Sequence, residues 1–101
     1  MKLMTEELQQ QIPLLYATED TPLEKKMVHA KFFTPDANWT WYITEYDPTE
    51  RLYFGYVIGH ESEWGYFSLD ELESVRGPFG LEIERDIHFE PITFKELKKE
   101  L

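Results

Sequence analysis

Carboxylates recur at every second residue in three short stretches. This spacing is the first feature of the sequence that suggests a functional surface. These stretches contain Glu45 and Asp47, then Glu61 and Glu63, then Glu82, Glu84 and Asp86. On a β-strand, residues two positions apart share a face at about 6.6–6.8 Å. That interval is of the order of two phosphate steps along one nucleic-acid strand. Such rows can imitate phosphates to a protein that binds DNA or RNA. A merely solubilising surface is the alternative, since every alternating strand produces this spacing.

Histidines next to carboxylates are the second candidate for chemistry. Asp86, His88 and Glu90 alternate along one predicted strand and could reach a divalent metal. Their side chains start about 7 Å apart at each step, and they lack the closed ligand set of a typical metal site. We therefore predict no metal site and no cofactor. His60 lies beside two acids on a predicted loop and could act as an acid–base group, although a turn histidine is more often simply exposed.

The sequence lacks the motifs of common catalytic and nucleotide-binding sites. It has no cysteine, which excludes disulfides, thiolate zinc sites and a cysteine nucleophile. None of its serines lies in a G-x-S-x-G context. None of its glycines forms a phosphate-binding loop. We therefore expect a protein that is not an enzyme.

Length and charge set the class of protein. The 101 residues carry a formal net charge of −10 and 16% aromatic residues. This length predicts a single acidic domain over residues 1–101, and the aromatic content favours a folded chain over a disordered one. The charge disfavours direct DNA binding and favours a basic protein partner. No apolar run is long enough to span a membrane, and the polar N-terminus does not look like a signal peptide. We expect a soluble, cytoplasmic protein without membrane contact.

Five strands are predicted from alternation and turn signals. They cover residues 27–33, 39–46, 52–58, 63–67 and 81–90. In the second strand, Trp39, Trp41 and Ile43 should share one face, and Tyr42 and Tyr46 the other. In the third strand, Gly55 should leave room for a large ring. Residues 14–16 are expected to pack under the sheet.

Three short helices flank these strands, each opened by a capping residue. Thr5 is the predicted N-cap of residues 5–12, and Ser68 and Thr93 begin capping boxes that open helices over residues 69–75 and from 94 onward. Short connections make the strands an antiparallel meander. The predicted fold class is α+β: a meander of about four to five strands with short N-terminal, central and C-terminal helices.

Residues 14–94 contain motifs that resemble a known bacterial family. The motifs are LYATE (15–19), KFFTP (31–35), NWTWY (38–42), FGYVIG (54–59), EWGYFSLDEL (63–72), and ERD (84–86) with Phe89. The family consists of uncharacterised small domains that occur on plasmids, conjugative elements and phage-derived DNA. It has no established catalytic residues to carry over. The resemblance implies an accessory or host-takeover role, including inhibition of restriction or CRISPR defences.

We hypothesise an acidic interaction protein that inhibits a nucleic-acid-binding host protein, such as a defence nuclease. Its predicted partner-binding residues are Glu45, Asp47, Glu50, Glu61, Glu63, Trp64, Asp70, Glu71 and Glu73, and Tyr53 is a further candidate anchor. One alternative is a small hydrolase or metal-dependent enzyme that uses His60 or His88 with carboxylates. Another is a nucleic-acid accessory protein that stacks bases on exposed rings, for which Trp39, Trp41, Tyr42, Tyr53 and Tyr66 are candidates. The sequence leaves the oligomeric state open.

Overall fold

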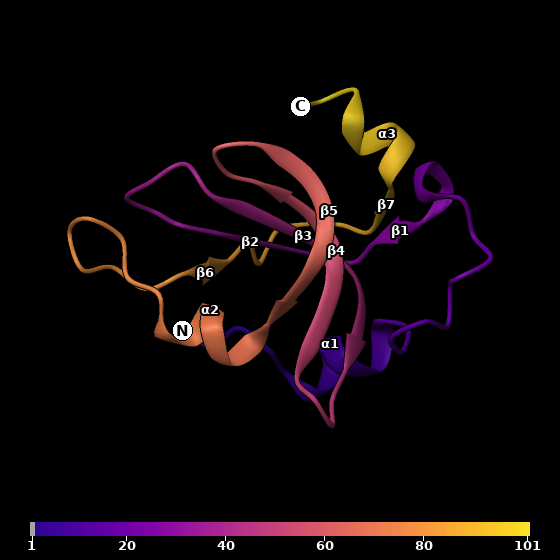
Figure 1. Ribbon diagram of the computed structural model, residues 1–101, viewed down its shortest axis with the longest axis horizontal. Coiled ribbons are helices and arrows are strands. Elements are labelled where there is room, and N and C mark those ends of the chain that lie inside the picture. The colour runs from indigo at the N-terminus through magenta and orange to yellow at the C-terminus, as the bar shows by residue number, and fades with distance from the viewer. Residues whose placement is uncertain (1) are drawn as a thin grey trace.

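A five-stranded antiparallel sheet forms the centre of the computed structural model, which describes residues 2–101 (Figure 1). Its strands are β2 (Ala30–Phe33), β3 (Thr40–Asp47), β4 (Leu52–Ile58), β5 (Ser62–Ser68) and β6 (Glu84–Arg85). Their spatial order is β5-β4-β3-β2-β6, so the first four follow one another as a meander. Together with three short α-helices, this confirms the predicted α+β class.

Two of the predicted strands are shorter than alternation suggested. Residues 27–33 divide into β1 (Met27–Val28) and β2, and β1 leaves the main sheet to pair with β7 (Ile92–Thr93). Within residues 81–90, β6 joins the main sheet opposite Phe32 and Phe33 at the end of β2, and Glu82 forms an isolated bridge with Arg76. The chain then turns, because the Asp86 carboxylate accepts a hydrogen bond from the His88 amide at 2.9 Å. The turn at Asp86 therefore ends a ladder that the alternating sequence could have continued along β2.

Each α-helix begins at its predicted cap. The helices are α1 (Glu6–Gln11), α2 (Leu69–Ser74) and α3 (Phe94–Lys98), with a 3-10 turn, η1 (Leu23–Lys25), between α1 and β1. The hydroxyls of Thr5, Ser68 and Thr93 each accept a hydrogen bond from the amide three residues later. Within the described chain, no helix has the length and apolar character needed to cross a membrane.

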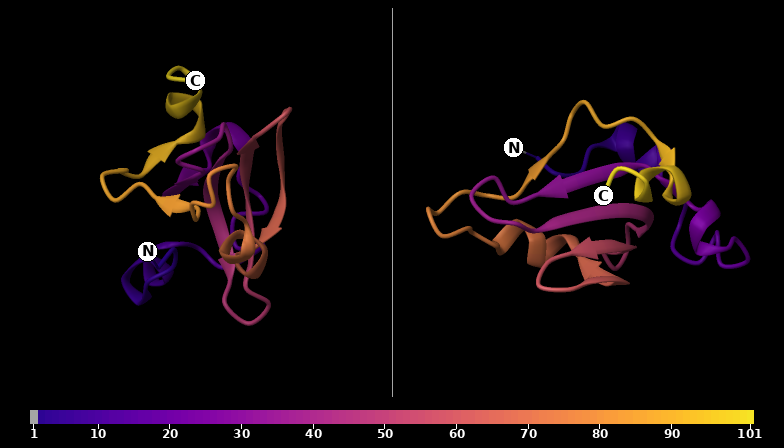
Figure 2. Two further views of the ribbon diagram at one scale, coloured as in Figure 1. Left: turned by 90° about the vertical axis from the view of Figure 1, so that its left-hand side faces the viewer. Right: turned by 90° about the horizontal axis from the view of Figure 1, so that it is seen from above.

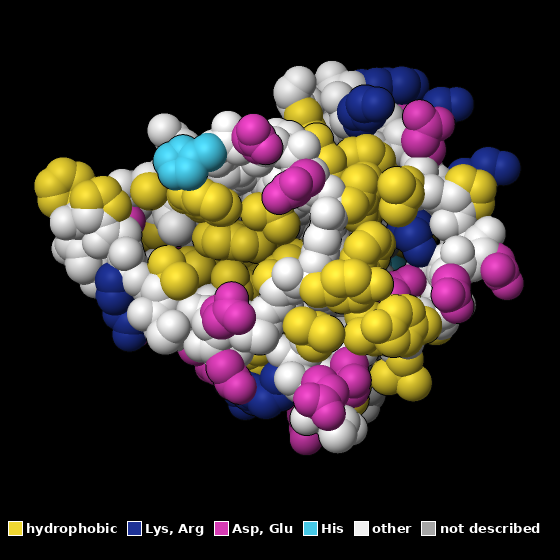
Figure 3. Space-filling view, in the orientation of Figure 1, with side chains coloured by type: hydrophobic (Ala, Val, Ile, Leu, Met, Phe, Trp, Pro, Cys, Tyr) yellow, Lys and Arg dark blue, Asp and Glu magenta, His cyan; other side chains and the backbone are white. Residues whose placement is uncertain are grey.

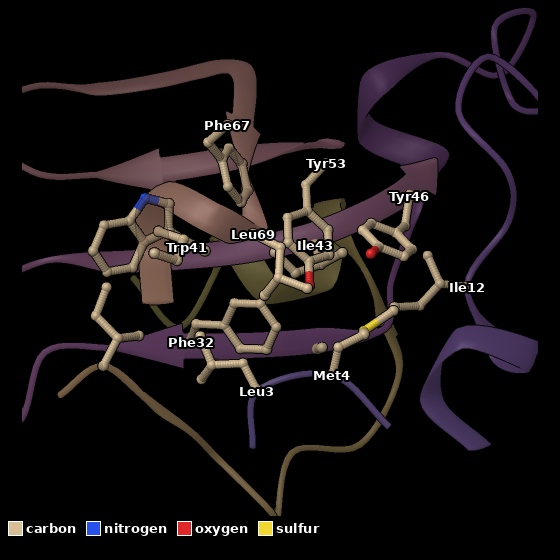
Figure 4. Packing of buried hydrophobic residues seen from close by; sticks show 13 residues of the cluster. Leu3, Met4, Ile12, Phe32, Trp41, Ile43, Tyr46, Tyr53, Phe67 and Leu69 are labelled. Carbon is tan, nitrogen blue, oxygen red and sulfur yellow. The ribbon is translucent and has the colours of Figure 1, made fainter. Parts of the chain in front are cut away.

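Both faces of the sheet are covered by apolar packing. One face carries the main core, in which Phe32, Trp41, Ile43, Tyr53 and Phe67 pack with α1, α2 and the N-terminal segment (Figure 4). The opposite face carries a smaller cluster of buried side chains: Val28, Tyr42, Phe94 and Leu97. This second cluster anchors α3 and the β1–β7 ladder. The buried rings of these two clusters are therefore not free for a partner.

A β-bulge in β3 reverses the alternation of the strand. The register to β4 shifts between Ile43 and Glu45, so the residues after the bulge exchange faces. Tyr46 enters the main core, where its ring centroid lies 4.6 Å from that of Tyr53. Its predicted position beside Tyr42 is therefore wrong. Glu45 is turned to the face that holds Tyr42.

The backbones of β3 and β4 approach each other closely at Gly55. A Cβ atom there would lie 1.9 Å from the carbonyl oxygen of Tyr42, so the glycine makes room for backbone and not for the predicted ring. The position under a ring is Gly59, where a Cβ would lie 2.3 Å from the Trp39 indole. Gly55 thus permits the strand pairing that surrounds the bulge.

We predict that Gly55→Ala lowers the free energy of unfolding by about 2–4 kcal/mol, because the backbone of β3 or β4 must shift. Gly65→Ala is the matched control in the paired position on β5, where a Cβ would meet no atom within 4 Å. The control should be neutral or stabilising by up to about 1 kcal/mol. Urea unfolding of the two variants checks this, and equal stability would contradict the close approach.

Candidate functional site

The predicted partner-binding acids divide into two groups at opposite ends of β4 and β5. Asp47 and Glu50 lie at the β3–β4 turn, next to α2 with Asp70, Glu71 and Glu73; we name these five residues the acidic end. Glu61 lies in the β4–β5 turn, and Glu63 lies near the start of β5. The seven residues of β4 separate the two groups by about 20 Å. The nine predicted residues therefore do not form one continuous site.

Arg51 organises the acidic end. Its guanidinium pairs with Asp70 at 2.7 Å and also with Glu73, and its carbonyl accepts a hydrogen bond from the first amide of α2 at 2.9 Å. These contacts hold α2 against the β3–β4 turn. Arg51 thus pairs with two of the five carboxylates, and the acidic end keeps an excess of negative charge. Exposed ion pairs of this kind add little stability.

Glu45 is not part of an exposed surface, which corrects its prediction as a partner-binding residue. Its exposed fraction is 3%, because the bulge turns it under the segment that precedes β1. One carboxylate oxygen accepts a hydrogen bond from the Tyr16 amide at 2.8 Å. The other accepts from the amide and hydroxyl of Thr18 and pairs with Lys26 Nζ at 3.4 Å.

The Glu45–Lys26 pair fastens residues 14–26 onto the sheet. Lys26 Nζ also donates to the carbonyl and hydroxyl of Thr18, at 2.6 and 2.7 Å, so both charges have full sets of partners. Burial pushes the pKa of Glu45 upward, but the hydrogen bonds from Thr18 and Tyr16 and the charge of Lys26 outweigh it, so the net pKa is lowered. The ionised pair is a structural tie and not a poised acid or base.

A pocket of about 330 Å³ opens above this tie. Its lining residues are Tyr16, Glu19, Thr21, Pro22, Leu23, Lys26, Glu45, Phe54 and Tyr66. We name it the Tyr16–Tyr66 pocket after the two rings at its mouth, whose centroids lie 6.3 Å apart. Glu45, Phe54 and Tyr66 occupy one row across β3, β4 and β5. That row lies next to the acidic end, so aromatic surface and negative charge adjoin.

The exposed rings at this pocket differ from the predicted anchors. Tyr53 is fully buried in the main core, and Trp64 is half-buried against Phe54 and Phe94. Tyr66 and Tyr16, by contrast, are 55% and 58% exposed. Tyr66 was among the predicted stacking rings, whereas residue 16 was expected under the sheet. Tyr16 has a positive φ of 71°, and no local signal in the sequence indicated it.

Negative charge surrounds these rings. The pKa of Tyr66 is raised by the partial burial of its ring, by the Tyr16 hydroxyl and by the carboxylates of Glu45 and Glu19. Its hydroxyl therefore remains a neutral donor and acceptor at physiological pH. Phosphates would be repelled here, whereas a guanidinium or ammonium group would be attracted to both the carboxylates and the ring faces.

A second, larger pocket lies on the same face of the sheet, where Tyr42 and α3 border it. It measures about 500 Å³, and Asp86, His88 and Glu90 border it together with Lys31, Tyr42 and Glu100. The structure thus brings the predicted histidine–carboxylate group to one cavity. Among the described residues, however, no hydrogen bond joins the His88 ring to a carboxylate, and no group of three or more potential ligands is arranged to hold a metal. His60 is exposed, and its ring contacts the Trp39 indole with centroids 5.5 Å apart.

We predict that Glu45→Gln lowers the free energy of unfolding by about 2–4 kcal/mol at neutral pH, since it leaves the buried Lys26 charge without its partner. Because the pKa of Glu45 is lower in the folded state, its contribution is fully present above the unfolded pKa and is lost as pH falls through the folded pKa. The difference between wild type and variant should therefore shrink below about pH 4.3. Denaturant unfolding between pH 7 and pH 3 checks this, and a constant difference would contradict the ionised pair.

Comparison with known proteins gives a family but no activity. No curated protein and no solved structure matches the chain. A family model described as "Protein of unknown function (DUF2958)" matches residues 3–95. Since this match covers nearly the whole chain of 101 residues, the protein belongs to the DUF2958 family.

Proposed function

We propose that this protein is a non-enzymatic interaction module that binds a basic, nucleic-acid-binding protein through the acidic end and the Tyr16–Tyr66 pocket. The observation that carries the proposal is the exposure of Tyr16 and Tyr66 on a sheet face that ends in an acidic residue, Asp47, two positions after Glu45 in β3. At the same end of the sheet, Arg51 pairs with Asp70 and Glu73. Interfaces are enriched in aromatic anchors, and unopposed carboxylates steer a positively charged partner towards them.

The surface pattern agrees with such a partner. Figure 3 shows hydrophobic side chains gathered over β4 and β5, with acidic side chains around them and at the tip of the β3–β4 turn. Large exposed apolar patches with a polar rim are typical of protein-binding surfaces. Because carboxylates frame the exposed rings, a protein partner fits this face better than stacked bases do.

The partner class follows from charge and from the resemblance to a family found on mobile DNA. A protein that grips nucleic acid presents a basic groove, and an acidic surface can occupy such a groove. We therefore propose an anti-defence role, in which the protein blocks a restriction or CRISPR nuclease of the host. Blocking would occur by competition for the groove, without any chemical step.

The test is a pull-down of purified DNA-binding and guide-RNA-binding nucleases at about 50 and 300 mM salt. Wild-type protein should capture its partner at low salt and lose most of it at high salt. Glu50→Lys with Glu71→Lys should abolish capture, because it reverses two exposed charges at the acidic end.

Glu90→Lys with Glu96→Lys is the matched control. It makes the same change in net charge at the end of the molecule that carries α3, far from the β3–β4 turn (Figure 1). Capture by the control with loss in the acidic-end variant would support the proposal. Equal loss of capture in both variants would mean that binding depends on net charge alone and not on the acidic end. No capture by the wild-type protein would refute the proposal.

The pocket bordered by Asp86, His88 and Glu90 supports a second candidate, a small hydrolase. It places an imidazole, three carboxylates and the Tyr42 hydroxyl around one cavity, as acid–base chemistry requires. A panel of chromogenic ester, phosphoester and glycoside substrates tests it, with His88→Gln as the variant and His60→Gln as the control. Turnover lost only in His88→Gln would favour the enzyme, and turnover that is absent or unchanged would reject it.

A further inference from the structure

Strand β5 is an open edge of the main sheet. It pairs with β4 through seven consecutive residue pairs, from Leu52 opposite Ser68 to Ile58 opposite Ser62, and the sheet order places no described strand on its other side. Both views in Figure 2 show β5 at the margin of the molecule. The opposite edge, β6, is only two residues long. An edge of this length presents backbone donors and acceptors that an added strand can use.

The usual protections against edge pairing are missing from β5. The strand contains no proline and no lysine, and its register to β4 runs without a bulge. Its one charged residue is Glu63. Proteins commonly blunt free edges with lysine, proline or a bulge, so this edge remains available for pairing.

Gly65, at the middle of β5, has no explanation within the folded chain. A Cβ there would meet no atom within 4 Å, and its φ lies outside the positive range that favours glycine. A glycine inside a strand lowers β-sheet stability and often marks the close approach of another chain. Gly55 in the paired position is required by the Tyr42 carbonyl, whereas Gly65 borders open space. The space beside Gly65 is therefore open to a side chain from another molecule.

We propose that β5 accepts an extended, basic segment of the protein partner as an additional strand, with a lysine or arginine opposite Glu63 and a bulky apolar side chain beside Gly65. The two partner side chains are two positions apart, as Glu63 and Gly65 are, and so share one face. On the other face, partner side chains would lie beside Trp64 and Tyr66, next to the Tyr16–Tyr66 pocket. This inference rests on the proposed function, because it names how that partner is held.

Charge decides between a basic segment and a second copy of this chain. From residue 52 to residue 75 the chain has five acids, Glu61, Glu63, Asp70, Glu71 and Glu73, and neither lysine nor arginine. Pairing of two β5 edges would bring two such stretches together, and like charges across a strand pair are destabilising. A segment with lysine or arginine gains attraction from the same acids.

The test uses a capped nonapeptide with lysine at its third and seventh positions, phenylalanine at the fifth and threonine elsewhere. Titration should protect from hydrogen exchange those amides of residues 62–68 that point away from β4. The same peptide, N-methylated at alternate residues along one edge, keeps every side chain and charge but loses backbone donors. It should bind at least about tenfold more weakly, as expected for two or more lost hydrogen bonds. A second peptide, methylated along its other edge, controls for conformational effects and should retain binding.

The Gly65→Thr variant distinguishes a loss of peptide binding to β5 from a loss of folding stability. The fold has room for the new side chain, and threonine favours strands, so the unfolding midpoint should stay the same or rise. Peptide affinity should nevertheless fall by about fivefold or more, since the space for the phenylalanine is filled.

Three results would overturn the proposal: unchanged exchange at residues 62–68, equal binding of all three peptides, or a dimer of the wild type that Gly65→Thr dissolves. The first two, together with salt-sensitive capture of a nuclease, would reject strand addition and leave the proposed function standing. Loss of nuclease capture alone, with peptide pairing intact, would reject the proposed partner class.

Discussion

The change of alternation within β3 is the constraint on which the rest of the structure depends. One bulge between Ile43 and Glu45 sends Tyr46 into the main core and Glu45 to the opposite face. Without it, the carboxylate of Glu45 would point into the apolar core and Tyr46 away from Tyr53. The Glu45–Lys26 pair, the attachment of residues 14–26 and the pocket bordered by Tyr16 and Tyr66 all follow from this single irregularity. A buried charge is tolerated here because every oxygen of the carboxylate has a partner.

Local signals in the sequence predicted the helices and the meander well. The caps at Thr5, Ser68 and Thr93 depend only on neighbouring residues, and short turns determine the pairing of β3, β4 and β5. Features that depend on distant partners were not predictable. Alternation over residues 81–90 could not show that the chain turns at Asp86 after two pairs with β2. Nothing around residue 28 indicated a ladder with Ile92.

The candidate site was predicted in part, for related physical reasons. Acids in turns and on α2 are exposed as expected, since turns leave side chains in solvent. Glu45 was misplaced because a bulge has no reliable sequence signal, and Tyr53 and Trp64 because both faces of the sheet are covered. The exposed Tyr16 depends on how residues 14–26 are fastened to the sheet. That fastening is a long-range effect of Lys26 and Glu45.

The pairing of β1 with β7 has a consequence for the order of folding. Met27 and Thr93 are far apart in the sequence, so their ladder requires closure of a long loop, whereas each hairpin of the meander closes only a short one. Local contacts generally form first. The β3–β4–β5 meander should therefore assemble early, and the attachment of α3 and β7 should come late. In kinetic terms, the β5 edge and Tyr66 belong to the part that forms early, and a nascent chain can display them before its final helix has docked.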